Sequence, residues 1–106
     1  MRLIELIQYL EKQVFYNPNR IAFWGFSSPH SYRGYYERVA FEPTLDVSIK
    51  DMLESAKEAL GSEYTGWKGW KYTMHEDTLC YLANEGNTGT ELTKELLHFL
   101  VYSKEQ

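Results

Sequence analysis

The sequence has very little cysteine and no long apolar run. Its single cysteine, Cys80, excludes a disulfide within the chain and is typical of a protein from a reducing compartment. No apolar run approaches the roughly 18 residues that a membrane-spanning helix needs, and the start, Met-Arg-Leu-Ile-Glu, lacks the apolar core of a secretory signal. We therefore expect a cytoplasmic protein that does not enter a membrane.

The residue patterns of common catalytic sites are also missing. No second His or Cys has the spacing of a metal ligand, and the phosphate-binding pattern Gly-x-x-x-x-Gly-Lys-Ser/Thr is absent. Cys80 lies in an apolar run without an identifiable base, and His30, His75 and Glu42 are only loose candidates for acid–base chemistry. The sequence favours a binding protein over an enzyme, with no catalytic residue, metal or cofactor expected.

Acidic residues are absent from two stretches of an otherwise acidic chain. The net charge is −4, yet no acid lies between Glu11 and Glu37 or between Glu63 and Glu76. The basic residues in these two stretches are Lys12, Arg20, Arg33, Lys68 and Lys71. An acidic chain binds a long nucleic acid poorly, because backbone binding requires clustered cations. Two local cationic stretches favour a compact anion such as a nucleotide phosphate.

Aromatic residues are abundant. They make up 16% of the chain, including nine Tyr and three Trp, which exceeds what a core of this size needs. Some rings should therefore line a surface or a cleft, where Tyr and Trp combine an apolar body with a hydrogen-bonding group. The length is suited to one domain, residues 1–106, because it provides one hydrophobic core and not two.

Two segments have the apolar period of a helix. In residues 2–15, apolar side chains recur at spacings of four, three and four. Residues 48–60 begin with Ser48 as a capping residue, with Asp51 three positions on, and Gly61 supplies a left-handed C-terminal residue. Residues 92–102 fit a helix face and a buried strand equally well, so their structure stays open.

Short runs rich in aromatic and β-branched residues predict strands. These runs are residues 21–26, 35–42, 70–74 and 79–83. In the second run, alternation places Arg38 and Glu42 on one face, which predicts an ion pair, and the run should stop at Pro43. The expected fold is α+β, with an antiparallel sheet of about four strands, an N-terminal helix and a second helix packed on one face. The strand order does not follow from the sequence.

A first motif occupies residues 27–43. Its centre reads Ser-Pro-His-Ser-Tyr-Arg-Gly-Tyr-Tyr, so Arg33 lies between tyrosines and precedes a glycine. Such a setting suits a guanidinium that is presented to a planar or anionic partner, because Arg stacks on rings and grips oxyanions with two parallel N–H groups. The alternative is a tyrosine-rich hairpin whose Arg pairs with a nearby carboxylate.

A second motif occupies residues 63–74. Thr65-Gly66-Trp67-Lys68-Gly69 has the composition of a turn that exposes backbone N–H groups, a hydroxyl and an ammonium, a combination that can cradle a phosphate. Trp67 or Trp70 could stack on a base. The alternative is a plain hairpin turn with both lysines in solvent.

The two motifs together predict one ligand-binding site. Its residues are Ser31, Tyr32, Arg33, Tyr35, Thr65, Trp67, Lys68 and Lys71. Arg33 and a lysine of the second motif would hold phosphates, aromatic rings from both motifs would stack on a base, and the two hydroxyls would bond phosphate or ribose oxygens.

The same motifs carry a resemblance over about residues 20–86. Ser-Pro-His-Ser-Tyr-Arg-Gly-Tyr-Tyr with the trailing Ala-Phe-Glu-Pro, and then Tyr-Thr-Gly-Trp-Lys-Gly-Trp-Lys-Tyr-Thr-Met, resemble a family of small, mostly uncharacterised phage-encoded proteins. Where that family tends to read Thr-Gly-aromatic-Lys-Gly-Gly, this chain has Trp70 in place of the last glycine. The resemblance implies a phage origin and action in the cytoplasm of an infected bacterium, and it implies no activity.

Two functional hypotheses follow. One is a phage counter-defence protein that binds and sequesters a small nucleotide-type immune signal without cleaving it. The alternative is a phage inhibitor that contacts a host defence protein through an aromatic surface, since Tyr, Trp and Arg also dominate protein interfaces. We expect a homo-oligomer, because so small a domain forms a deeper pocket between subunits than within one.

Overall fold

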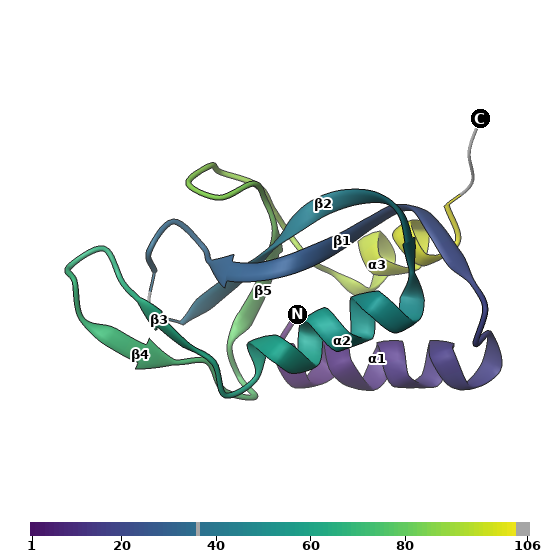
Figure 1. Ribbon diagram of the computed structural model, residues 1–106, viewed down its shortest axis with the longest axis horizontal. Helices are drawn as coiled ribbons and strands as arrows, with labels where there is room; N and C mark the ends of the chain where they lie inside the picture. Colours follow the sequence, from purple (N-terminus) through teal and green to yellow (C-terminus); the bar gives the residue numbers. More distant parts are fainter. Residues whose placement is uncertain (36, 104–106) are drawn as a thin grey trace.

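The structure, a computed structural model, describes residues 1–35 and 37–103. Three helices and six strands occur in these residues (Figure 1). In chain order they are α1 (Leu3–Tyr16), β1 (Ile21–Ser31), β2 (Arg38–Ser48), α2 (Ile49–Ala59), β3 (Glu63–Thr65), β4 (Lys71–Thr73), β5 (Leu79–Leu82), β6 (Thr90–Glu91) and α3 (Lys94–Val101). The predicted α+β class, the N-terminal helix and the second helix packed on the sheet are confirmed.

The main sheet has four strands in the order β1-β2-β5-β6. The β1–β2 and β5–β6 pairs are antiparallel, whereas β2 and β5 run parallel, so the sheet is mixed where a purely antiparallel one was expected. Parallel neighbours need a long crossover connection. Here α2 and the separate two-stranded hairpin β3–β4 provide it, and the hairpin projects from one end of the molecule (Figure 1).

The first two strands are longer than predicted. β1 continues past Phe26 to Ser31 through a β-bulge between Ser27 and Pro29, and β2 continues through Pro43 to Ser48. β5 pairs with β2 only as far as Phe41. At Pro43, β2 therefore has a neighbouring strand on one side only, a position where a proline is tolerated.

The core lies between the sheet and the two long helices, which run side by side beneath it (Figure 1). Its largest fully buried side chains come from both layers and include Leu6, Leu10, Phe26, Phe41 and Met52. The predicted cap of the second helix is present, since the Asp51 amide donates to Ser48 Oγ at 3.0 Å, and Gly61 has the expected left-handed φ of +81°.

The C-terminal segment that the sequence left open is the helix α3. Thr93 caps it by accepting a hydrogen bond from the Leu96 amide at 3.1 Å, and its buried face is formed by Leu97, Leu100 and Val101. Across the described ranges, no helix has both the length and the apolarity needed to cross a bilayer.

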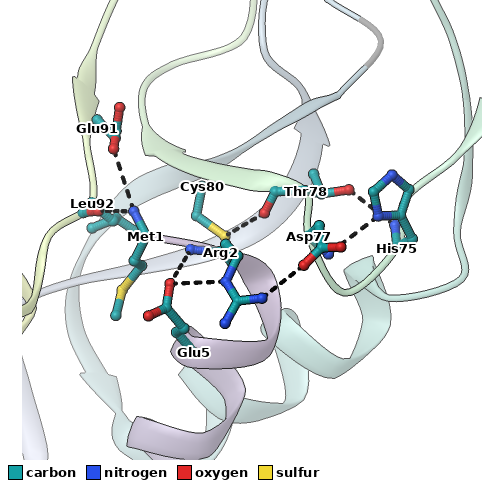
Figure 2. Close-up of polar contacts among 9 residues, drawn as sticks. All are labelled: Met1, Arg2, Glu5, His75, Asp77, Thr78, Cys80, Glu91 and Leu92. Carbon is teal, nitrogen blue, oxygen red and sulfur yellow. Dashed lines mark hydrogen bonds and ion pairs between the residues drawn. The ribbon is translucent and has the colours of Figure 1, made fainter.

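The start of the chain is joined to β5 and to the turn before it (Figure 2). The Leu3 amide donates to the Thr78 carbonyl at 2.7 Å, and the Cys80 amide donates to the Met1 carbonyl at 3.0 Å. The Arg2 guanidinium binds Asp77 at 2.8 Å. These contacts hold β5 against α1 and so fix the strand that leads into the site described next.

A candidate ligand cleft between three loops

The first motif forms a tight turn that positions Arg33. The Tyr35 amide donates to the Tyr32 carbonyl at 2.9 Å, and both residues between them, Arg33 and Gly34, have left-handed φ values of +52° and +79°. Positive φ at both central residues is the pattern of a type I′ hairpin turn. For a residue with a side chain this backbone costs about 1–2 kcal/mol, so Arg33 is held in a strained conformation.

The second motif packs directly on this turn. The Trp67 amide donates to the Gly34 carbonyl at 3.0 Å, and the Tyr72 hydroxyl donates to the Tyr35 carbonyl at 2.7 Å. A Cβ on Gly34 would lie only 2.9 Å from the Trp67 backbone nitrogen. The close approach of the hairpin to the turn therefore requires glycine at this position.

An open cleft of about 580 Å³ lies between the β1–β2 turn, the β3–β4 hairpin and the loop after β5. Its lining residues are His30, Ser31, Arg33, Gly34, Tyr64, Thr65, Gly66, Trp67, Glu85 and Gly86. The volume is within the range of small-molecule sites, about 300–1,000 Å³. Four predicted residues, Ser31, Arg33, Thr65 and Trp67, thus line one cavity.

The two predicted tyrosines do not line the cleft. Tyr32 is only 6% exposed: its ring stacks on Tyr81 at a centroid distance of 4.0 Å, and its hydroxyl accepts from the Gly89 amide at 3.2 Å. The Tyr35 ring lies under the Arg38 guanidinium at 5.1 Å. The Tyr32 ring is packed within the protein, whereas the Tyr35 ring is 41% exposed but lies outside the cleft lining.

The predicted lysines also lie outside the lining. Lys71 Nζ is 3.7 Å from a carboxylate oxygen of Glu63, which lies diagonally across the hairpin because Lys71 itself pairs with Thr65. Lys68 Nζ lies 5.0 Å from the Trp67 ring and 5.8 Å from the Trp70 ring, a cation–π arrangement at the hairpin tip.

The second motif was predicted to present its backbone amides to a phosphate, and for three of these amides the prediction is wrong. Gly66 donates to the Trp70 carbonyl at 2.8 Å, Gly69 donates to the Gly66 carbonyl at 2.9 Å, and the Trp67 amide is bonded to Gly34. These N–H groups are used to close the hairpin turn and to attach it to the first motif, so they are not directed at a ligand.

The predicted Arg38–Glu42 ion pair is wrong. Residues four apart on a strand share a face but are separated by about 13 Å, because each residue advances the chain by about 3.3 Å. Arg38 lies over aromatic rings, whereas a Glu42 carboxylate oxygen is 3.2 Å from His30 Nε2 and accepts from the Glu85 amide at 2.9 Å. Glu42 therefore joins His30 to the loop after β5.

His30 forms part of the cleft wall. Its Nδ1 lies 3.0 Å from the Ser31 carbonyl, and its Nε2 lies 3.1 Å from the Ala83 carbonyl, besides the Glu42 contact. Carbonyl oxygens only accept hydrogen bonds, and a neutral imidazole has one N–H, so the tautomer decides which of the two carbonyls His30 donates to. Neither nitrogen is placed to take a proton from a ligand, and the ring instead ties β1 to the end of β5.

Sequence reasoning missed six lining residues: His30, Gly34, Tyr64, Gly66, Glu85 and Gly86. His30 is inside the first motif, so its position was a usable signal. Glu85 and Gly86 belong to a polar loop without a motif of its own, and the parallel pairing of β2 with β5 brings that loop to the cleft. A pairing between distant strands is not visible in local sequence.

No protein-family model, no curated protein and no solved structure matches this chain. The chemistry of the cleft is therefore the guide to function. Within the residues that the structure describes, no three His, Cys, Asp or Glu side chains gather in a way that could hold a metal ion.

Proposed function

We propose that this chain binds a small nucleotide in the cleft and releases it chemically unchanged, acting as a phage counter-defence protein that sequesters an immune signal. The observation that carries the nucleotide proposal is the placement of Arg33 and Trp67 on one cavity, although 34 positions separate them in the chain (67 minus 33). A guanidinium and an exposed indole suit the two ends of a nucleotide.

The lining groups have complementary tasks in this proposal. Arg33 grips a phosphate through two N–H groups, a charge-assisted contact that is stronger than a neutral hydrogen bond. Trp67 is 65% exposed and stacks on the base, a contact that contributes about 1–3 kcal/mol in single-strand binders. Ser31 Oγ accepts from the Gly34 amide at 3.1 Å, so its own hydrogen is available for a ligand oxygen.

Binding without cleavage is supported by the groups around the cleft. His30 has both nitrogens directed at acceptors, which suits a structural ring better than a general base. Cys80 lies in the core outside the cleft lining, and burial raises the pKa of its thiol to about 12, so this side chain is a poor nucleophile that does not face a ligand in the cleft. A ligand bound in the cleft would therefore be released chemically unchanged.

The biological setting in this proposal rests on the resemblance of the two motifs to phage-encoded proteins. On that basis we place the protein in the cytoplasm of an infected bacterium. The cleft is formed within one chain, and the homo-oligomer expected from the size of the domain stays a prediction.

A protein partner is the second candidate. Trp67 and Trp70 are 65% and 68% exposed at neighbouring positions of the hairpin, with the Lys68 ammonium near both rings. Exposed Trp side chains are typical energetic centres of protein interfaces. In this case a host defence protein would cover the hairpin, and its binding would not require a nucleotide.

A thermal melt tests the proposal. The purified protein would be heated with cyclic dinucleotides, cyclic ADP-ribose isomers and ordinary nucleotides. A ligand at about one hundred times its Kd stabilises the folded state by about 2.7 kcal/mol, which gives an easily measured rise in Tm. We expect one such ligand, recovered unaltered after the protein is denatured. A flat panel at millimolar concentrations contradicts nucleotide binding and directs the search to pull-downs with host proteins.

A further inference from the structure

The charges on the cleft wall are balanced. Among the described lining residues, Arg33 is the one arginine or lysine, and Glu85 is the one aspartate or glutamate. Glu42 lies behind the wall with its carboxylate beside His30. The cleft lining therefore contains one guanidinium, whose Nη1 also donates to Thr88 Oγ1 at 3.3 Å, and one carboxylate that repels further negative charge.

No second cation reaches this space in the described structure. Lys71 is beside Glu63, and Lys68 lies near the two indoles at the hairpin tip. The amides of Gly66, Trp67 and Gly69 are used within the protein. Sites for nucleoside triphosphates combine several cationic or N–H groups, often with Mg²⁺, to hold the charge of the phosphates. This cleft lacks such a set in its described lining.

The position of Glu85 is set by its backbone. Its amide donates to a Glu42 carboxylate oxygen at 2.9 Å, and Gly86 after it has a left-handed φ of +79°, which turns the chain at the cleft. The Glu85 carboxylate is exposed and makes no hydrogen bond or ion pair with any described residue. A free carboxylate accepts hydrogen bonds from hydroxyl or N–H donors of a ligand and repels phosphate oxygens.

We infer that the cleft selects nucleotides whose phosphate is a singly charged phosphodiester over nucleoside triphosphates, with Arg33 on the diester and Glu85 on a hydrogen-bond donor of the ribose or base. This inference rests on the proposed function and names its ligand class. One guanidinium neutralises one diester charge. A cyclic dinucleotide has one further diester charge, whereas a triphosphate has more, and these charges meet the Glu85 carboxylate without a counterion.

Calorimetric titration of the full chain tests this selectivity. The ligands are 3′,5′-cyclic AMP, 3′,5′-cyclic GMP, two cyclic dinucleotides, ATP and GTP, all at one ionic strength and with EDTA to remove Mg²⁺. We expect at least one diester ligand to bind ten times more tightly than the triphosphate of the same base. In Glu85→Gln that ratio should fall at least threefold, mainly because the triphosphate binds more tightly.

Glu54→Gln is the matched control, because it removes the same charge from the exposed surface of α2, outside the cleft. It should leave the ratio unchanged. Triphosphates that bind as tightly as the diesters, or tighter, overturn the inference but keep the proposed function. Equal effects of the two substitutions overturn the role of Glu85. If neither class of ligand binds, the proposed function fails and the inference fails with it.

Discussion

The amide of Trp67 donates a hydrogen bond to the carbonyl of Gly34 at 3.0 Å, and the space between the two residues leaves no room for a Cβ on Gly34. This contact joins the two sequence motifs, because Gly34 belongs to the first and Trp67 to the second. It also fixes the spacing of two lining residues. Arg33 directly precedes Gly34, and the indole belongs to the residue whose amide makes the bond, Trp67. The site depends on this backbone contact as much as on its side chains.

Gly34→Ala should therefore destabilise the protein and weaken ligand binding. The substitution forces an alanine into a left-handed backbone and against Trp67, at a cost of about 2–4 kcal/mol in the free energy of unfolding. Gly69→Ala is a matched control: φ there is +84°, but no atom lies within 4 Å of the added Cβ. Urea denaturation should give about 1–2 kcal/mol for this control. Equal losses of unfolding free energy for the two variants would show that the close contact with Trp67 adds nothing to the cost of the Gly34 substitution.

Arg33→Gly should separate binding from stability. Glycine adopts a φ of +52° without strain, so the free energy of unfolding should stay the same or rise by up to about 1 kcal/mol. Ligand affinity should fall at least tenfold, because the guanidinium is lost. Lys71→Ala, which removes a cation outside the cleft, should change affinity less than twofold. A variant of Arg33 that still binds normally would exclude this residue as the anion grip.

The Cys80 thiol should be unreactive in the folded protein. Burial raises its pKa from 9.0 to about 12, so almost no thiolate is present at pH 8. A chromogenic disulfide reagent should label the native protein very slowly and the urea-unfolded protein within seconds. Because the folded pKa is the higher one, the associated stability is present below about pH 9 and is lost as the pH rises towards 12. Cys80→Ala should show a smaller loss over this range. Rapid labelling of the native protein would contradict the buried position.

Glu5 should make folding sensitive to acid. The backbone amide of Arg2, at 2.9 Å, and then the Arg2 side chain lower the pKa of the Glu5 carboxyl below its ordinary value of 4.5. A lowered pKa in the folded state gives stability that is present above pH 4.5 and lost as the pH falls through the folded value. Glu5→Gln should therefore flatten the acid side of a Tm–pH profile, and Glu11→Gln on the same helix should not. Identical profiles for the two variants would refute the capping contribution of Glu5.

Local signals predicted the helices well. Ser48, Asp51 and Gly61 marked the ends of α2 correctly, because capping is a contact within one turn of the chain. The structure of the C-terminal segment, residues 92–102, could not be predicted, because its short apolar run fits both the helical and the strand repeat. Packing of Leu97 and Leu100 into the core selected the helix, and such packing depends on residues far away in the sequence.

The site was predictable only in part for the same reason. The motifs pointed to Arg33 and Trp67, which do line one cleft, but the predicted tyrosines and lysines lie outside its lining. Tyr32 stacks on Tyr81, a partner that the sequence does not indicate. Glu85 reaches the cleft through the parallel β2–β5 pair, a long-range pairing that alternation and turn residues cannot reveal.

The most direct test of the account is ¹⁹F NMR of protein labelled with 5-fluorotryptophan. The chain has three tryptophans, and Trp→Phe variants would assign their resonances. Trp67 lines the cleft, whereas Trp24 lines a separate apolar groove with Pro43 and Leu45 and so serves as an internal control. On addition of a stabilising nucleotide, we expect the Trp67 resonance to shift in a saturable way and the Trp24 resonance to stay in place. A shift of Trp24 alone, or an unmoved Trp67 at saturation, would contradict the assignment of this cleft as the ligand site.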